Sequence, residues 1–315
     1  MPAAAASATA PPARRPGPAG VLWRFSRPHT VIGTWLGITG LFAIALHAAP
    51  GASPGDAAFQ LACVLIAGTC VNVAIVGVNQ ITDVEIDRIN KPRLPIAAGE
   101  LSTPAAWRVV AVAALVPVAM ALTQGWVETA AVLVALAIGA AYSLPPVRLK
   151  RHPVAASLCI AGVRSAVVNL GVAVHFSNAF GGGGQVPGAV WALCLFVLPF
   201  SFAIAVLKDV PDGEGDRRFR IATFTIRLGA RRAAWLGLGA LGLAYAGMAI
   251  GGPFALPEAN AAVLAGGHLA AAGLLAWWAH RTDPDDPHAF TRFYMRVWVL
   301  FFLEYLLVPA SVLAG

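Results

Sequence analysis

Two aspartates and an asparagine, spaced four residues apart, mark the stretch of this sequence that could carry out chemistry. Asn79, Asp83 and Asp87 follow a long run of residues without charge. If the preceding helix continued from Val78 to Arg88, the three side chains would lie one above another on one face. Two carboxylates about 6 Å apart repel by about 3 kcal/mol at an effective dielectric constant of about 20, so the pair needs a counter-cation. Mg2+ suits such a pair, because it takes few protein carboxylates and keeps positions open for phosphate oxygens.

A second acidic cluster with a related spacing follows another apolar run far downstream. Asp212 and Asp216 are four residues apart, and Asp209 stands three residues before Asp212. One such pattern alone is more typical of a solvated helix end. Two clusters, each at the exit of an apolar run and each mixed with Lys and Arg, favour a functional site instead.

The composition is that of an integral membrane protein. Of the 315 residues, 58% are hydrophobic and 12% are charged, and the mean hydropathy is +0.72, whereas a soluble domain carries about 25% charged residues. Membrane topology explains the net charge of +7 better than nucleic acid does, because the sequence has no basic helix with interleaved aromatic residues. We therefore expect no nucleic-acid partner. The four cysteines lie inside apolar runs without metal-ligand spacing and are expected to be packed thiols.

Nine apolar runs are long enough to cross a bilayer, which takes about 20 residues. We expect an all-α, polytopic membrane protein of about nine transmembrane helices, with residues 23–315 forming one domain. Residues 1–22 are rich in Ala, Pro and Gly and predict a disordered cytosolic tail, with an organelle transit peptide as the alternative. The predicted spans are 29–49, 57–80, 104–123, 126–144, 153–177, 187–207, 231–250, 258–279 and 292–313.

The distribution of basic residues gives the orientation. With the N-terminus inside, the Lys and Arg residues between spans all fall in inner loops, and the outer loops hold none. This asymmetry matches the excess of Lys and Arg in cytosolic loops of membrane proteins. Both acidic clusters then lie on the cytosolic side of the membrane.

The two clusters resemble the aspartate-rich motifs of the UbiA-type intramembrane aromatic prenyltransferases. Further phrases are similar to the homogentisate phytyltransferase branch of that family, and the resemblance extends from about Trp23 to the C-terminus. The phrases are FSRPHT at 25–30, NKPRLPIAAGELS at 90–102 and TFTIRLG at 223–229.

The resemblance implies a cavity open to lipid, capped by cytosolic loops, with two Mg2+ ions that bridge diphosphate oxygens. One ion would be bound by Asn79, Asp83 and Asp87, and the other by Asp209, Asp212 and Asp216. The expected diphosphate contacts are Arg88, Lys91, Arg148, Lys150, Arg164 and Lys208. The expected acceptor or cavity residues are Arg27, His29, Tyr142 and Asn169. Relatives carry a Tyr-x-x-x-Lys motif at the position of Tyr142, but here the fourth following residue is Pro146, which leaves that assignment open.

Arg164 falls inside the fifth predicted span, where a charge costs at least about 2.5 kcal/mol at mid-bilayer. We expect its guanidinium to point into the cavity, toward diphosphate or an acceptor carboxylate. The alternative is a side chain that extends to the interface. For Arg88 and Arg93 the alternative to a phosphate contact is a role in membrane orientation, since both fit the excess of basic residues in inner loops. His268 is expected to be a packed histidine, and Glu304 is an intramembrane acid without an evident partner.

The function implied by the resemblance is Mg2+-dependent transfer of a polyprenyl group from its diphosphate to a small aromatic acceptor. The branch points to a phytyl or other diterpenyl donor and to homogentisate, with loss of CO2, in tocopherol or plastoquinone synthesis. Other aromatic acceptors, such as 4-hydroxybenzoate, dihydroxynaphthoate or a phenolic natural product, stay open. A secondary transporter is the alternative outside enzymes, but transporters place ionisable residues near the bilayer midplane, whereas most here lie near span ends. We expect a bacterial cell membrane as the location and leave the oligomeric state open.

Overall fold

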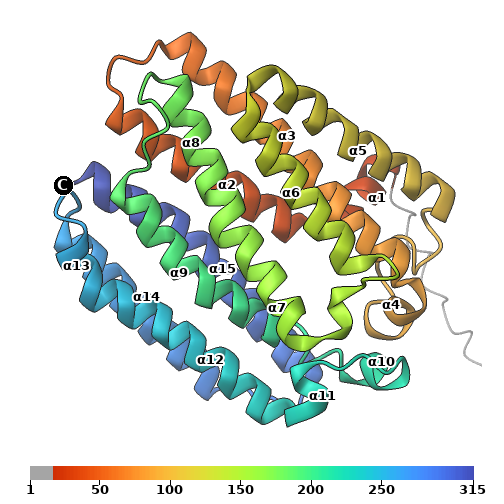
Figure 1. Cartoon of the computed structure of the whole chain (residues 1–315). Helices are drawn as coiled ribbons and strands as arrows, with labels where there is room; N and C mark the ends of the chain where they lie inside the picture. Colours follow the sequence, from red (N-terminus) through yellow and green to blue (C-terminus); the bar gives the residue numbers. More distant parts are fainter. Residues whose placement is uncertain (1–16) are drawn as a thin grey trace, which may run out of the picture.

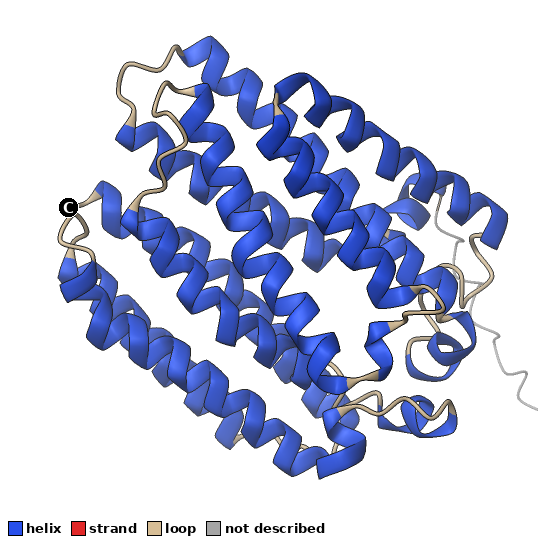
Figure 2. Ribbon diagram, in the orientation of Figure 1, coloured by secondary structure: helices blue, strands red, loops and turns tan. Residues whose placement is uncertain are grey.

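The computed structural model describes residues 17–315. Within these residues the chain is helical, with no strand (Figure 2), and nine segments are long and apolar enough to cross a membrane. The predicted spans are thus confirmed to within a few residues at most ends. The segments are α2 (Pro28–Ala48), α3 (Pro54–Thr82), α5 (Thr103–Gln124), α6 (Trp126–Ser143), the run of α7 (Pro153–Gly162), η2 (Val163–Val168) and α8 (Asn169–Ala179), α9 (Gly188–Leu207), the run of α12 (Ala230–Ala246), η3 (Gly247–Gly251) and α13 (Gly252–Ala255), α14 (Ala261–His280) and α15 (Pro287–Leu313).

Short helices lie at one end of the bundle, before the first span or between spans (Figure 1). They are α1 (Pro18–Phe25), α4 (Val84–Asn90), η1 (Leu149–Arg151), α10 (Gly213–Arg218) and α11 (Phe224–Leu228).

Proline and glycine set several boundaries of the spans. Proline occupies the first turn of α2, α3, α7 and α15, where its missing N–H costs no helical hydrogen bond. Gly125 separates α5 from α6 with a φ of 145°, a conformation that residues with a Cβ avoid. These local signals divide the apolar sequence into spans that hydropathy alone would partly merge.

The spans form two groups bridged by α2 and the fifth span. In the first group α3 packs against α5 and α6, and in the second α9 packs against α12 and α15. Helix α2 contacts α3, α8 and α15, so it joins the two groups (Figure 1). The largest hydrophobic core belongs to the second group and includes Phe196 and Phe200 of α9 and Phe301 of α15.

The fifth span contains a π-helical turn, η2, which holds Arg164. A π turn inserts one residue into a helical turn and is often found at functional sites. The neighbouring Ser165 fixes the turn, because its Oγ donates a hydrogen bond of 2.7 Å to the carbonyl oxygen of Cys194 in α9.

Two local predictions were wrong. The helix through Val78 to Arg88 is not continuous, because α3 ends at Thr82 and Asp83, with a φ of −117°, leads into α4. The predicted tail ends earlier than residue 22, since α1 begins at Pro18 and buries Phe25 completely. Residues 1–16 lie outside the described residues, so a disordered tail there stays a prediction.

Candidate active site

The two acidic clusters meet at one end of the bundle. Helix α4 follows α3, α10 follows α9, and the two short helices contact each other (Figure 1). Asn90 joins them directly: its Oδ1 accepts a 2.9 Å hydrogen bond from the backbone N–H of Gly215, and its Nδ2 donates to Asp216 Oδ1 at 3.5 Å. A Cβ at Gly215 would overlap that Oδ1, so a larger residue there would displace the Asn90 side chain. The clusters therefore form one site.

In the first cluster, Asp83 is surrounded by donors. Asn79 Nδ2 donates to Asp83 Oδ2 at 2.9 Å, and Lys150 Nζ donates to Asp83 Oδ1 at 2.6 Å. Arg148 Nη2 also lies 3.3 Å from Oδ1. Although the helix breaks at Asp83, the Asp87 N–H donates to the Asp83 carbonyl oxygen at 2.7 Å, which keeps Asp83 and Asp87 one helical turn apart.

In the second cluster, one cation is distant in the sequence and one is adjacent. Lys91, which follows α4, forms an ion pair with Asp212. Lys208 donates to the Tyr142 hydroxyl at 2.8 Å, and its Nζ lies 3.8 Å from Asp209 Oδ1. The structure thus brings Lys91, Tyr142 and Lys208 into the same site as the second motif.

Several of these carboxyl groups are costly to ionise in the folded protein. Burial raises the pKa of Asp87 to about 6 and that of Asp209 to about 6, from an ordinary value of 3.8. Burial, together with the nearby Asp209 and Asp212 carboxylates, raises the pKa of Asp216 to about 7. At Asp87, the positive charges of Lys91 and Arg27 lower the pKa, but by less than burial raises it. The site therefore has an excess of crowded carboxylates that an added cation would relieve.

The donor set fits Mg2+. Asp87 Oδ2 and Asp216 Oδ2 are buried, and neither has a hydrogen-bond partner in the described chain. Among residues 17–315, no three His, Cys, Asp or Glu side chains surround one point. A closed protein cage is therefore absent from this part of the chain. Mg2+ needs none, because it is typically held by one or two carboxylates, with substrate phosphates and water completing the shell.

The other predicted cations occupy different places. Arg88 lies on the exposed side of α4 and pairs with Glu85 at 2.6 Å, so the structure does not bring it into the cluster. Arg27 precedes α2 with a φ of 54°, and its Nε is buried without a partner within residues 17–315. Arg164 lies deeper in the bundle, where its guanidinium carbon is 4.7 Å from the centre of the Trp298 ring.

Aromatic residues of α15 line this deeper region, and the sequence reasoning missed them. His29 packs edge-on against Trp298, with ring centroids 4.9 Å apart, and the Tyr305 hydroxyl donates to Asn169 Oδ1 at 2.8 Å. A signal was present, because aromatic residues recur on one face of the last span at helical spacing; they are Tyr294, Trp298, Phe301 and Tyr305. Asn90 was also missed, although it opens the phrase at 90–102.

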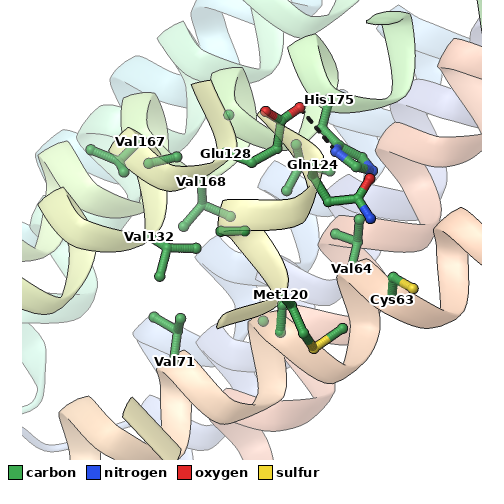
Figure 3. A pocket seen from close by; sticks show the side chains of 16 residues that line it. Cys63, Val64, Val71, Met120, Gln124, Glu128, Val132, Val167, Val168 and His175 are labelled. Carbon is green, nitrogen blue, oxygen red and sulfur yellow. Dashed lines mark hydrogen bonds and ion pairs between the residues drawn. The ribbon is translucent and has the colours of Figure 1, made fainter. Parts of the chain in front are cut away.

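Two further polar groups lie away from the aspartates. His268 Nε2 is 3.0 Å from Glu304 Oε2, and both side chains are buried, so His268 is packed as expected and Glu304 has a partner. A cavity of about 130 Å³ lies between α3, α5, α6 and α8 (Figure 3). His175 closes one end of it through contacts of 3.1 Å with Glu128 and Gln60. Its walls contain no motif aspartate.

Comparisons with known proteins agree with this geometry. The sequence profile of the UbiA prenyltransferase family matches residues 36–300. The chain is 41% identical to a homogentisate phytyltransferase from Synechocystis sp. over 92% of this chain and 94% of that protein. It is 40% identical to the chloroplastic homogentisate solanesyltransferase of Arabidopsis thaliana over 91% of this chain and 75% of that protein.

Solved structures share the fold at lower sequence identity. A UbiA homolog from Archaeoglobus fulgidus bound to GPP and Mg2+ superposes with a TM-score of 0.62 and 20% identity, over 92% of this chain and 99% of that one. A structure described as digeranylgeranylglyceryl phosphate synthase gives a TM-score of 0.64 at 17% identity, over 94% and 99% of the two chains. The chain is an integral membrane protein and belongs to the UbiA prenyltransferase family.

Proposed function

We propose that this protein transfers a polyprenyl group from its diphosphate to homogentisate. The observation that carries the proposal is the meeting of two aspartate clusters, with Asp87 Oδ2 and Asp216 Oδ2 unpartnered in the described chain, at one end of an intramembrane bundle. Relatives named for homogentisate prenyl transfer are up to 41% identical over nearly the whole chain. The donor is a phytyl or similar diterpenyl diphosphate.

The residues divide into metal ligands and phosphate contacts. Asn79, Asp83 and Asp87 would hold one Mg2+, and Asp209, Asp212 and Asp216 would hold another. Bound Mg2+ supplies positive charge that neutralises the diphosphate as it leaves. Lys91, Lys150, Arg148 and Lys208 already lie against these carboxylates. These four side chains can contact phosphate oxygens instead when Mg2+ replaces them beside the carboxylates.

The reaction proceeds without a covalent enzyme intermediate. The allylic C–O bond of the donor breaks, and both bonding electrons leave with the diphosphate. The electron-rich ring attacks the carbocation to form a C–C bond, and the ring then loses a proton. In the homogentisate reaction the side-chain carboxyl group also leaves as CO2 and a proton takes its place on the side-chain carbon, which gives a methylated prenylquinol on the route to tocopherols or plastoquinone. Clustered cations stabilise the charge that develops on the leaving group.

We place the protein in a bacterial cell membrane, with the N-terminus and the aspartate site facing the cytosol. The support is the excess of Lys and Arg on the side of the bundle where α4 and α10 lie. The catalytic unit is a single transmembrane domain that begins with α1 and needs no nucleic acid.

A product assay tests the function. The purified protein in detergent is incubated with Mg2+, phytyl or geranylgeranyl diphosphate, and a panel containing homogentisate, 4-hydroxybenzoate, dihydroxynaphthoate and an acylphloroglucinol. We expect a prenylated, decarboxylated product from homogentisate by mass spectrometry, and none after chelation of Mg2+. Product from another acceptor alone would replace homogentisate with that compound. An acylphloroglucinol is included because a 2-acylphloroglucinol 4-prenyltransferase of Humulus lupulus is 32% identical to this chain.

A further inference from the structure

Arg164 carries a charge that the described protein does not balance. It lies in the π turn η2, and no carboxylate within residues 17–315 forms an ion pair with it. Its Nη1 is buried and has no hydrogen-bond partner in that part of the chain. A cation in the middle of a span costs at least about 2.5 kcal/mol, and a buried donor left unpaired adds to that cost. Such a group is best explained by an anion that binds there.

The depth of Arg164 separates it from the metal site. It follows Pro153, the first residue of α7, by eleven residues, which is about 16 Å along a helix. Helical side chains point back toward the N-terminus of their helix, so the guanidinium is directed toward the end of the bundle that holds the aspartates. The side chain is too short to span the distance along the helix to that end. Lys91, Lys150 and Arg148 already supply the cations that contact the aspartates.

The walls around Arg164 are aromatic. The guanidinium carbon lies 4.7 Å from the centre of the Trp298 ring and 5.8 Å from that of Phe301. The His29 ring also packs against Trp298, and the two ring centroids are 4.9 Å apart. An aromatic ligand can stack or pack edge-on against such rings, while its acidic group meets the guanidinium. The surroundings therefore fit an aromatic carboxylate better than a diphosphate, which has no ring.

We infer that Arg164 binds the carboxylate of the aromatic acceptor, whose ring lies among Trp298, Phe301 and His29, and that Arg164 thereby selects acidic acceptors over uncharged quinols. This inference rests on the proposed function and adds the residue that recognises the acceptor. The carboxylate then lies at the deep end of the site and the ring lies between it and the diphosphate. Arg27, whose Nε is also unpartnered in the described chain, precedes His29 by two residues.

The test compares homogentisate with methylhydroquinone, which keeps the quinol ring but lacks the carboxylate. For wild type and Arg164→Gln, kcat/KM is measured for both acceptors at saturating donor. We expect the ratio of the two values to fall by about thirtyfold or more in Arg164→Gln, because removing one partner of a buried charge pair costs at least about 2 kcal/mol. The KM for the prenyl diphosphate stays unchanged. Arg164→Lys gives an intermediate ratio, since lysine keeps the charge and loses the bidentate geometry.

Arg281→Gln is the matched control. Arg281 also lies 4.7 Å over a tryptophan ring, that of Trp277, but on the exposed surface, so its loss should leave the ratio as in wild type. A second readout is the melting temperature without donor. Homogentisate should raise it in wild type and not in Arg164→Gln, and methylhydroquinone should raise it equally in both.

The outcomes are distinct. An unchanged ratio with a raised diphosphate KM would assign the guanidinium to the donor and overturn the inference, while leaving prenyl transfer intact. Absence of product from wild type with either acceptor would instead contradict the proposed function. If Arg164→Gln does not fold, Arg164→Lys decides the question, because an unchanged ratio in that folded variant would also overturn the inference.

Discussion

The two aspartate clusters share a spacing but not an environment. Asp83 of the first cluster receives Asn79, Arg148 and Lys150, all from the first half of the chain. Asp212 of the second cluster pairs with Lys91, which the first half also supplies. Asp209 has a cation of its own cluster beside it, Lys208, so the second cluster takes only part of its compensating charge from the first half of the chain. A repeated sequence pattern does not produce two equivalent sites, because several of the cations that surround each pattern come from other parts of the fold.

The largest expected effect comes from removing one aspartate from each cluster. Asp83→Ala and Asp212→Ala should each lower kcat by about a thousandfold or more, because each removes a metal ligand and metal-assisted charge stabilisation contributes several kcal/mol. The rate of prenylated product formation at saturating Mg2+ measures this. Near-normal turnover in either variant would show that only one cluster is catalytic.

A smaller effect separates the clusters by their cations. Lys91 is the cation that pairs with Asp212, whereas Lys150 shares Asp83 with Arg148. Lys91→Met should therefore lower kcat/KM for the donor by about a hundredfold, and Lys150→Met by about tenfold, since Asp212 is buried and leaving a buried charge without its partner costs about 2 to 5 kcal/mol when nothing replaces it. Equal losses, or the reverse order, would remove the asymmetry described above.

The protonation of the carboxyl groups predicts how Mg2+ stabilises the protein. Burial raises the pKa of Asp87 and Asp209 to about 6 and that of Asp216 to about 7, above their values in the unfolded chain. The folded, metal-free protein thus holds these protons more tightly than the unfolded chain. This contribution favours folding at low pH and is lost as pH rises from about 4 through about 7.

Because Mg2+ binds the deprotonated carboxylates, the rise in melting temperature on adding Mg2+ should be larger at pH 8 than at pH 5.5. Thermal unfolding in detergent at both pH values measures this. Asp216→Asn is the control, since it removes the group with the highest of the three pKa values and should reduce the pH dependence. A rise that is equal at both pH values would contradict the prediction.

The smallest expected effect concerns the link between the clusters. Asn90→Ala removes the hydrogen bonds to Gly215 and Asp216, which should lower the free energy of unfolding by about 1 to 2 kcal/mol and reduce activity modestly. Gly215→Ala should be more damaging, because the new Cβ would overlap the Asn90 side chain. Melting temperature and product formation, measured together, rank the two variants. A more stable Asn90→Ala protein would show that the link is not structural.

The sequence predicted the nine spans and the meeting of the clusters for clear physical reasons. Hydropathy marks spans strongly, and the basic loops placed both clusters on one side of the membrane. The break at Asp83 escaped prediction, because the residues from Val78 to Arg88 fit a helix and the bend is imposed by tertiary contacts such as Lys150 with Asp83.

Pairings between distant residues were also beyond the sequence. Glu304 and His268 are 36 residues apart, and each is a polar residue in an apolar run. Nothing local indicates that α14 and α15 bring them together. The same holds for Lys91 and Asp212, which are 121 residues apart. In contrast, the aromatic face of α15 could have been found from its spacing.

The central claim is that both clusters form one Mg2+-dependent diphosphate site. The most direct test is calorimetric titration of the detergent-solubilised protein with geranylgeranyl diphosphate, without acceptor and with or without Mg2+. It compares wild type with Asp83→Asn and Asp212→Asn. We expect tight binding only for wild type with Mg2+, and strong weakening in each variant. Binding that persists without Mg2+, or that survives the loss of either aspartate, would contradict it.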